Sequence, residues 1–176
     1  WGTALAVLAA RNGYPVALWG PDAARLARIE HERENAAYLP GVRFPDNLHT
    51  RDDLAALVRD TRQILIAVPS HAFRVTLKAI SPHLQPDTII AWATKGLEPG
   101  SGKLLSAVYR EELDEAATGT SLSRGPRLAP IGERAGFGVI SGPSFAREVA
   151  AGLPTALTVA AAREPVAARI ADWLRN

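Results

Sequence analysis

A lysine that follows an apolar, β-branched run could bind an anionic ligand or polarise a carbonyl group. The run Thr88-Ile89-Ile90 leads into Ala91-Trp92-Ala93-Thr94-Lys95-Gly96, which predicts a buried parallel strand with a sharp turn at its carboxyl end. Ligands bind at that end of the strands in open α/β sheets. Lys95 is one of only three lysines, with Lys78 and Lys103, so we take it as a candidate ligand-binding cation. A solvated loop lysine is the alternative, and this stretch alone does not decide between them.

A second candidate site is the stretch Ser141-Gly142-Pro143-Ser144, which follows the predicted strand 137–140 and precedes a predicted helix from Ser144 to Ala151. A strand-to-helix junction of this kind offers unpaired backbone N–H groups and a hydroxyl at a helix N-terminus. Such groups bind anions. We therefore expect an anion site at the same edge of the sheet as Lys95.

Two further stretches carry weaker patterns. Trp1-Gly2-Thr3 opens a predicted helix and could be the back half of a G-x-G-x-x-G dinucleotide motif, although a glycine merely tolerated at a helix start is the alternative. In Val68-Pro69-Ser70-His71 we expect Ser70 to cap the following helix. No carboxylate is spaced to orient His71 as a base, so we interpret it as structural.

The elements that must position these residues alternate between helix and strand. The helix 2–11 is closed by Asn12-Gly13, the strand 14–19 follows, and Asp22 is expected to cap a helix to about Glu34. Strands separated by helical stretches predict a parallel, doubly wound α/β sheet. The remaining predicted elements are a loop at 35–47, a helix from Asp52 or Asp53 to about Arg59, a strand at 63–68, helices at 70–80 and 103–116, a mobile loop at 118–136, a strand at 156–160, and a helix from Glu164 to Asn176.

Composition limits the classes of function. The chain of 176 residues, 47% of them hydrophobic, is on the scale of one domain. It has no cysteine, and its four histidines lack metal-ligand spacing, so we expect no metal site. A net charge of +2 with dispersed arginines argues against nucleic acid as a partner, and no apolar run is long enough to insert into a membrane. Because the chain starts at Trp1 and has no methionine, we expect an upstream segment to be missing.

Seven stretches in order resemble bacterial NAD(P)-dependent glycerol-3-phosphate dehydrogenase. They are Trp-Gly-Thr-Ala-Leu-Ala at 1–6, Arg-Asn-Gly at 11–13, Leu-Trp-Gly at 18–20, Asn-Ala-Ala-Tyr-Leu-Pro-Gly at 35–41, Val-Pro-Ser-His at 68–71, Ala-Thr-Lys-Gly-Leu-Glu at 93–98, and Ile-Ser-Gly-Pro-Ser-Phe-Ala at 140–146. The resemblance implies a Rossmann-like domain over residues 1–176. It also implies interconversion of dihydroxyacetone phosphate and sn-glycerol 3-phosphate for glycerophospholipid synthesis, with NAD or NADP as the cofactor.

The resemblance also implies roles for individual residues. Lys95 looks like the lysine that contacts both substrate and cofactor, and Gly142 and Ser144 resemble the substrate-binding pair. The implied cofactor-binding residues are Trp1, Gly2, Pro21, Lys95 and Ala146. The partner would be a small phosphorylated substrate in the cytoplasm.

Three departures from the family limit what the chain can do. The first strand with its two glycines is absent, and so is the C-terminal helical domain, where the family keeps its base lysine and where a homodimer would form. We therefore expect no catalytic base before Asn176 and an inactive fragment. The loop 118–136 is also longer than expected for the family, and we assign it no function.

Two other classes of protein remain open. One is a related two-domain dehydrogenase that acts on 3-hydroxy acids, against which the pair Ala-Thr-Lys-Gly and Ser-Gly-Pro-Ser argues. The other is a non-catalytic dinucleotide sensor, which would keep the sheet but would not need Lys95.

Overall fold

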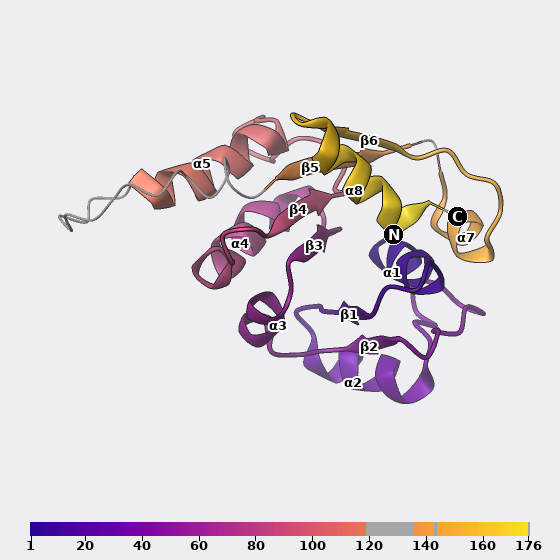
Figure 1. Cartoon of the computed structure of the whole chain (residues 1–176). Coiled ribbons are helices and arrows are strands. Elements are labelled where there is room, and N and C mark those ends of the chain that lie inside the picture. Colours follow the sequence, from indigo (N-terminus) through magenta and orange to yellow (C-terminus); the bar gives the residue numbers. More distant parts are fainter. Residues whose placement is uncertain (119–135, 143, 176) are drawn as a thin grey trace.

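The computed structural model describes residues 1–118, 136–142 and 144–175, in which helices alternate with strands (Figure 1). The predicted loop 118–136 therefore lies almost wholly outside the described residues. The elements are α1 (Gly2–Arg11), β1 (Val16–Leu18), α2 (Ala23–Glu32), β2 (Leu48–Thr50), α3 (Leu54–Asp60), β3 (Gln63–Ile66), α4 (Ser70–Ile80), the 3-10 helix η1 (Ser81–His83), β4 (Ile89–Trp92), α5 (Leu105–Thr118), β5 (Phe137–Ser141), α7 (Ala146–Ala151), β6 (Thr158–Ala161) and α8 (Glu164–Leu174).

The strands of the described residues form two sheets, one ordered β1-β2 and the other β3-β4-β5-β6. The pairs β1–β2, β3–β4 and β4–β5 are parallel, which confirms the predicted α/β class. The pair β5–β6 is antiparallel, a direction that the sequence analysis did not foresee. An antiparallel edge strand on an otherwise parallel sheet is common in doubly wound folds.

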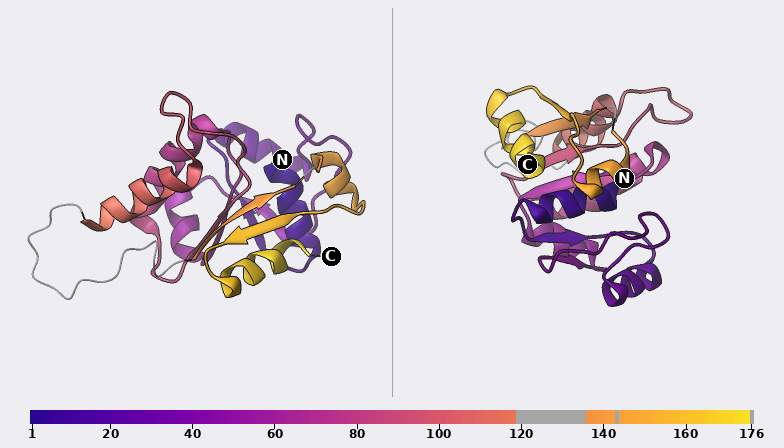
Figure 2. Two further views of the ribbon diagram at one scale, coloured as in Figure 1. Left: turned by 90° about the horizontal axis from the view of Figure 1, so that it is seen from above. Right: turned by 90° about the vertical axis from the view of Figure 1, so that its right-hand side faces the viewer.

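Helices cover both faces of the larger sheet. Figure 1 shows α3, α4 and α5 on one side and α1 and α8 on the other, and the turned views of Figure 2 show the same layering. All four residues of β4 are buried, as expected for a strand covered on both faces. On the side of α4 and α5, Trp92 lies 5.5 Å from Phe73, 5.5 Å from Tyr109 and 5.4 Å from Phe137, measured between ring centroids. These ring contacts hold β4 in its position within the core.

The helix starts follow the predicted caps in two of three cases. Asp22 accepts a hydrogen bond from the Arg25 amide at 2.9 Å, and Asp53 accepts one from the Ala56 amide at 2.9 Å. The predicted cap at Ser70 is wrong, because Pro69 occupies the capping position of α4 and no side chain bonds to the free amides there. Ser70 lies one residue too late in the chain, inside the first turn.

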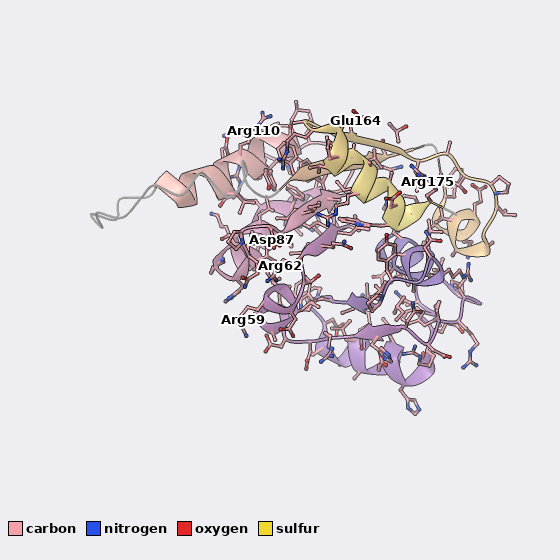
Figure 3. The ribbon with its side chains drawn as sticks, in the orientation of Figure 1. Arg59, Arg62, Asp87, Arg110, Glu164 and Arg175 are labelled. Carbon is pink, nitrogen blue, oxygen red and sulfur yellow. The ribbon has the colours of Figure 1, made fainter. Side chains whose placement is uncertain are left out.

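An exposed ion pair joins the starting ends of β3 and β4. Arg62 Nε lies 2.8 Å from Asp87 Oδ1, and both side chains are labelled in Figure 3. The amide of Ile89 donates to the Arg62 carbonyl at 2.8 Å, in keeping with the parallel register that pairs Gln63 with Ile89. Since both charged groups are well exposed, we expect this pair to add less than about 1 kcal/mol to stability.

A group of partly exposed polar contacts ties α2 to β2, the strand that the sequence analysis missed. Glu30 accepts a hydrogen bond from the Thr50 amide at 2.6 Å and lies 3.0 Å from His49 Nδ1. Arg33 binds the same carboxylate at 2.8 Å and donates to the Leu48 carbonyl at 2.6 Å. These contacts hold a strand of only three residues in place.

We expect the contribution of Glu30 to stability to disappear in acid. Burial raises the pKa of this carboxyl, but the hydrogen bonds from His49 and Thr50 and the charge of Arg33 outweigh it and lower the pKa from 4.5 to about 2. A carboxyl whose pKa is depressed by folding stabilises the protein above its unfolded pKa and loses that contribution as the pH falls towards its folded pKa. Glu30→Gln should therefore lower the melting temperature at pH 7, and the difference from wild type should shrink between about pH 4.5 and about pH 2.

The carboxylate is 36% exposed, so screening reduces the expected loss at pH 7 to about 1 kcal/mol. The measurement is thermal unfolding of both proteins, followed by circular dichroism at several pH values. A difference in melting temperature that stayed constant across that range would contradict the assignment.

Candidate functional site

Lys95 lies at the carboxyl end of β4, as predicted. The strand ends at Trp92, and the buried Thr94 hydroxyl donates to the Val68 carbonyl at 2.8 Å, which joins the ends of β4 and β3. Lys95 is the first exposed residue after this anchor, and Gly96 turns the chain with φ 90°. Glycine adopts this left-handed conformation at less cost than any other residue. The strand and its turn therefore present one cation at the edge where open α/β sheets bind ligands.

The Lys95 ammonium brings three predicted site residues together. Its Nζ lies 5.6 Å from the centre of the Trp1 ring and 3.4 Å from the Gly142 carbonyl oxygen. The first contact is a cation–π interaction, and the second is a long hydrogen bond. Residues separated by up to 141 positions in the sequence thus meet around one charge.

Gly2 and Trp1 occupy the first turn of α1. A Cβ atom added to Gly2 would lie 3.2 Å from the Cβ atom of Ala67, so the helix approaches the sheet more closely than a larger residue would easily allow. Close helix–sheet contact is the role of the last glycine in a dinucleotide motif. The Trp1 carbonyl accepts the Leu5 amide at 3.1 Å, and the Trp1 Nε1 group is buried without a hydrogen-bond partner among the described residues.

The segment before α7 differs from its prediction. The helix begins at Ala146, two residues later than expected, and Phe145 is its N-cap residue without a side-chain cap. Ser144 consequently precedes the helix, and its Oγ atom is buried with no hydrogen-bond partner in the part of the chain that the structure describes. Ala146 is partly buried against the core on the side of α1. The anion site expected at this junction remains a prediction.

Gly142 has a structural reason to be glycine. A Cβ atom at this position would lie 2.5 Å from the Ala156 carbonyl oxygen and 3.2 Å from a Leu157 side-chain atom. A distance of 2.5 Å is shorter than any real contact of a Cβ atom, so a larger residue would displace the chain that leads into β6. The glycine therefore permits close packing at a position where the resemblance implies substrate binding.

Pro21 lies apart from this cluster, at the end of β1 in the smaller sheet. It is exposed and precedes Asp22, which caps α2. Arg25, in the first turn of α2, donates to the Tyr38 hydroxyl at 3.2 Å and lies 5.2 Å from the centre of the Tyr38 ring. Its guanidinium is also 3.5 Å from the Asp22 carboxylate. The nearest charged groups to Pro21 in sequence are therefore already engaged with each other.

The sequence analysis missed the charged group around Arg74. This arginine on α4 forms ion pairs with Glu98, Glu111 and Glu112, and Glu98 belongs to the loop that begins at Lys95. The glutamate was visible in the Lys-Gly-Leu-Glu stretch, but no local pattern joins it to a residue 24 positions earlier.

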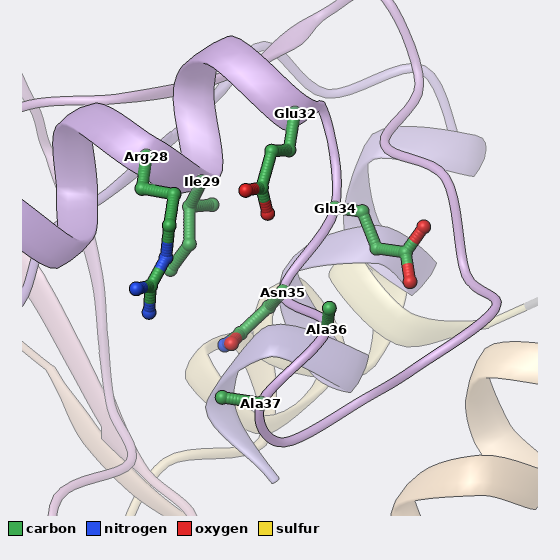
Figure 4. Close-up of a pocket in the computed structure, with 7 residues that line it drawn as sticks. All are labelled: Arg28, Ile29, Glu32, Glu34, Asn35, Ala36 and Ala37. Atoms are coloured by element: carbon green, nitrogen blue, oxygen red, sulfur yellow. The ribbon is translucent and has the colours of Figure 1, made fainter.

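A hollow of about 410 Å³ lies between α2 and the segment after it, lined by Arg28, Ile29, Glu32, Glu34, Asn35, Ala36 and Ala37 (Figure 4). Asn35 in this lining donates to the Thr3 hydroxyl at 2.8 Å, while its Oδ1 atom has no partner among the described residues. None of the residues around Lys95 lines it.

Among the described residues, no group of three or more His, Cys, Asp or Glu side chains could hold a metal ion. No described helix combines the length and the apolar character that a bilayer crossing needs.

Solved structures of glycerol-3-phosphate dehydrogenases share this fold. The glycerol-3-phosphate dehydrogenase of Coxiella burnetii superposes with a TM-score of 0.84 at 36% identity, covering 100% of this chain and 48% of that one. The enzyme of Saccharomyces cerevisiae shares the fold with a TM-score of 0.75 at 24% identity, covering 100% of this chain and 51% of its own.

The sequence matches the family described as NAD-dependent glycerol-3-phosphate dehydrogenase N-terminus over residues 1–131 and 129–167. The chain belongs to this family. Glycerol-3-phosphate dehydrogenase [NAD(P)+] of Salmonella paratyphi B is 46% identical over 167 residues, which is 95% of this chain and 44% of the relative. The protein of the same name from Salmonella enteritidis PT4 gives the same values. The chain thus spans somewhat less than half the length of these relatives.

Proposed function

We propose that this chain is the cofactor-binding part of an NAD(P)-dependent glycerol-3-phosphate dehydrogenase that interconverts dihydroxyacetone phosphate and sn-glycerol 3-phosphate. The observation that carries the proposal is the group of residues around the Lys95 ammonium, which meets the Trp1 ring and the Gly142 carbonyl at the carboxyl edge of the sheet. Nearby in sequence, Ser144 has a buried hydroxyl with no partner among the described residues. A buried hydroxyl of this kind gains a partner when a polar ligand binds.

Each residue has a defined task in this proposal. The bound nicotinamide supplies or accepts the hydride. Lys95 Nζ donates a hydrogen bond to the substrate carbonyl oxygen and stabilises the negative charge that develops on it. Ser144 Oγ hydrogen-bonds the substrate, and the Trp1 ring packs beside the cofactor. Ala146 contacts the cofactor through its backbone, and Gly2 lets α1 approach the sheet so that the helix N-terminus faces the pyrophosphate.

An assay of the full-length protein tests the proposal. Purified enzyme should oxidise reduced nicotinamide cofactor when dihydroxyacetone phosphate is added and should leave it unchanged when a 3-keto acid is added. The reverse preference would assign the chain to the hydroxyacid dehydrogenases. Cofactor binding without turnover of either substrate would support the dinucleotide sensor.

We further propose that the reaction takes place in the cytoplasm at the start of glycerophospholipid synthesis. We also propose that the dimer contact lies outside residues 1–176.

The full-length enzyme is expected to use NADH and NADPH with kcat/KM values within about a hundredfold of each other. Dinucleotide sites select NAD with a free acidic residue after the second strand and NADP with a free arginine there. Here Pro21 offers no donor, while Asp22 caps α2 and Arg25 contacts Tyr38. Steady-state kinetics with each cofactor at saturating substrate measure the ratio, and a larger preference in either direction would contradict this account.

A further inference from the structure

The loop that carries Lys95 folds back on itself. Leu97 and Leu104 form an isolated antiparallel bridge, and the Glu98 amide donates to the Lys103 carbonyl at 2.9 Å. Three glycines in this loop have positive φ, namely Gly96 at 90°, Gly100 at 85° and Gly102 at 67°. Glycine restricts the backbone less than any other residue. These internal contacts close the loop, but they do not fix its direction relative to the sheet.

The carboxylate of Glu98 supplies the connection to the rest of the fold. Arg74 Nε donates to Glu98 Oε1 at 2.6 Å, and Arg74 Nη2 donates to Oε2 at 2.8 Å. This is a bidentate pair, the geometry that gives an arginine–carboxylate contact a fixed direction as well as strength. The Glu98 side chain is only 13% exposed, so water screens the contact weakly.

Arg74 is itself held from other directions. It lies on α4, next to the fully buried Phe73, and its guanidinium also binds Glu111 Oε2 at 2.8 Å and the Glu112 carboxylate. Both glutamates lie on α5, so one guanidinium joins two helices and the loop. The hydrogen bonds to the three carboxylates raise the pKa of Arg74, and the bond from Arg74 is the main cause that lowers the pKa of Glu98 to about 2. The pair therefore stays charged across the physiological pH range.

Lys95 lies between two anchors. On one side, Thr94 is fixed to the end of β3 through the Val68 carbonyl. On the other side, only Gly96 and Leu97 separate Lys95 from the Glu98 anchor. We propose that Arg74 and Glu98 are positioning residues, whose bidentate ion pair sets the direction in which Lys95 presents its ammonium group to the substrate. This inference rests on the proposed function of Lys95.

The test uses the full-length enzyme and compares Glu98→Gln with Glu112→Gln. Both variants remove one carboxylate from Arg74. Glu112 lies on α5, and its ion pairs among the described residues are with Arg74 and Lys78, both on α4, so Glu112→Gln controls for loss of charge and stability. Glu98→Gln should lower kcat for dihydroxyacetone phosphate about tenfold, because a small misplacement of a catalytic group has effects of this order. The melting temperature should match that of Glu112→Gln.

A double variant separates positioning from a general structural effect. If Glu98 acts through the lysine, adding Glu98→Gln to Lys95→Ala should cause no further loss of kcat. An additive loss in the double variant, or a kcat of Glu98→Gln equal to that of the control, would overturn the inference. Arg74→Lys keeps the positive charge but loses the two-donor geometry of the guanidinium. Its kcat should lie between those of the wild type and Glu98→Gln.

A crystal structure of Glu98→Gln gives a readout that needs no substrate. The Lys95 ammonium should leave its place beside the Trp1 ring and the Gly142 carbonyl, and an unchanged position would overturn the inference even if the enzyme proved to act on another substrate. Absence of any activity on dihydroxyacetone phosphate in the wild-type enzyme would instead overturn the proposed function, while the position of Lys95 in the crystal would still decide the role of the ion pair.

Discussion

Replacing Lys95 by alanine in the full-length enzyme is expected to lower kcat/KM for dihydroxyacetone phosphate by about two orders of magnitude, the scale of one lost preorganised polar contact. The ammonium lies at the carboxyl edge of the sheet, 3.4 Å from the Gly142 carbonyl and beside the Trp1 ring, so it is already oriented before a ligand arrives. Donors that need no reorientation give most of their stabilisation to the charge that develops during reaction.

Lys78→Ala is the matched control. This lysine lies on α4, its side chain is 63% exposed, and its ammonium is 3.9 Å from the Glu112 carboxylate. Its loss should leave kcat/KM unchanged, because an exposed pair of this length contributes little. If Lys95→Ala lost less than about threefold, well below the value of one transition-state contact, Lys95 would be a bystander and the sensor interpretation would gain support.

The 176-residue chain by itself is expected not to reduce dihydroxyacetone phosphate. In the described residues, β1 is an edge strand of one sheet and β3 is an edge strand of the other. The outer backbone edge of each therefore has no neighbouring strand among these residues. A central strand with its glycine turn would complete both edges and build the dinucleotide site. Unpaired strand edges also promote aggregation, and the fragment should be poorly soluble or partly disordered.

Chemistry should fail for a separate reason. Lys95 and Ser144 are the polar groups that the proposal assigns to hydrogen-bonding the substrate, whereas the resemblance to the family implies that the proton donor to the forming alkoxide is a base lysine beyond Asn176. Isothermal titration with NADH and a turnover assay test both points. Adding the upstream strand should restore cofactor binding alone, and adding both missing parts should restore binding and turnover. Reduction of dihydroxyacetone phosphate by purified residues 1–176 would contradict this assignment.

Local patterns were enough to predict most helices and strands. The bounds of α1 agree with the prediction at both ends, and Asn12-Gly13 is the stop signal at its C-terminal end. The strand β2 was missed because Leu48-His49-Thr50 is too short to show a period, and it depends on Glu30 and Arg33 from α2. The direction of β6 was likewise beyond local patterns, since side-chain alternation is the same in parallel and antiparallel pairs.

The candidate site was predictable one residue at a time, but its geometry was not. The position of Lys95 follows from the strand and turn around it. Its contact with Trp1 depends on how α1 packs on the sheet, and the need for glycine at position 142 becomes visible only when Ala156 is placed beside it. All of the implied binding roles remain predictions, namely those of Trp1, Gly2, Pro21, Lys95, Gly142, Ser144 and Ala146.

The last turn of α1 is tied to residues that lie far later in the chain. The Arg11 guanidinium donates to the Ala150 carbonyl, 139 residues later, and the Asn12 amide donates to the Trp173 carbonyl at 3.0 Å, 161 residues later. Contacts of such long range form late in folding, because a large loop must close first. α1 is therefore translated well before the partners of its last turn, and its side chains Leu5 and Leu8, which pack in the same core cluster as Ile170 and Trp173, wait for those residues to be made.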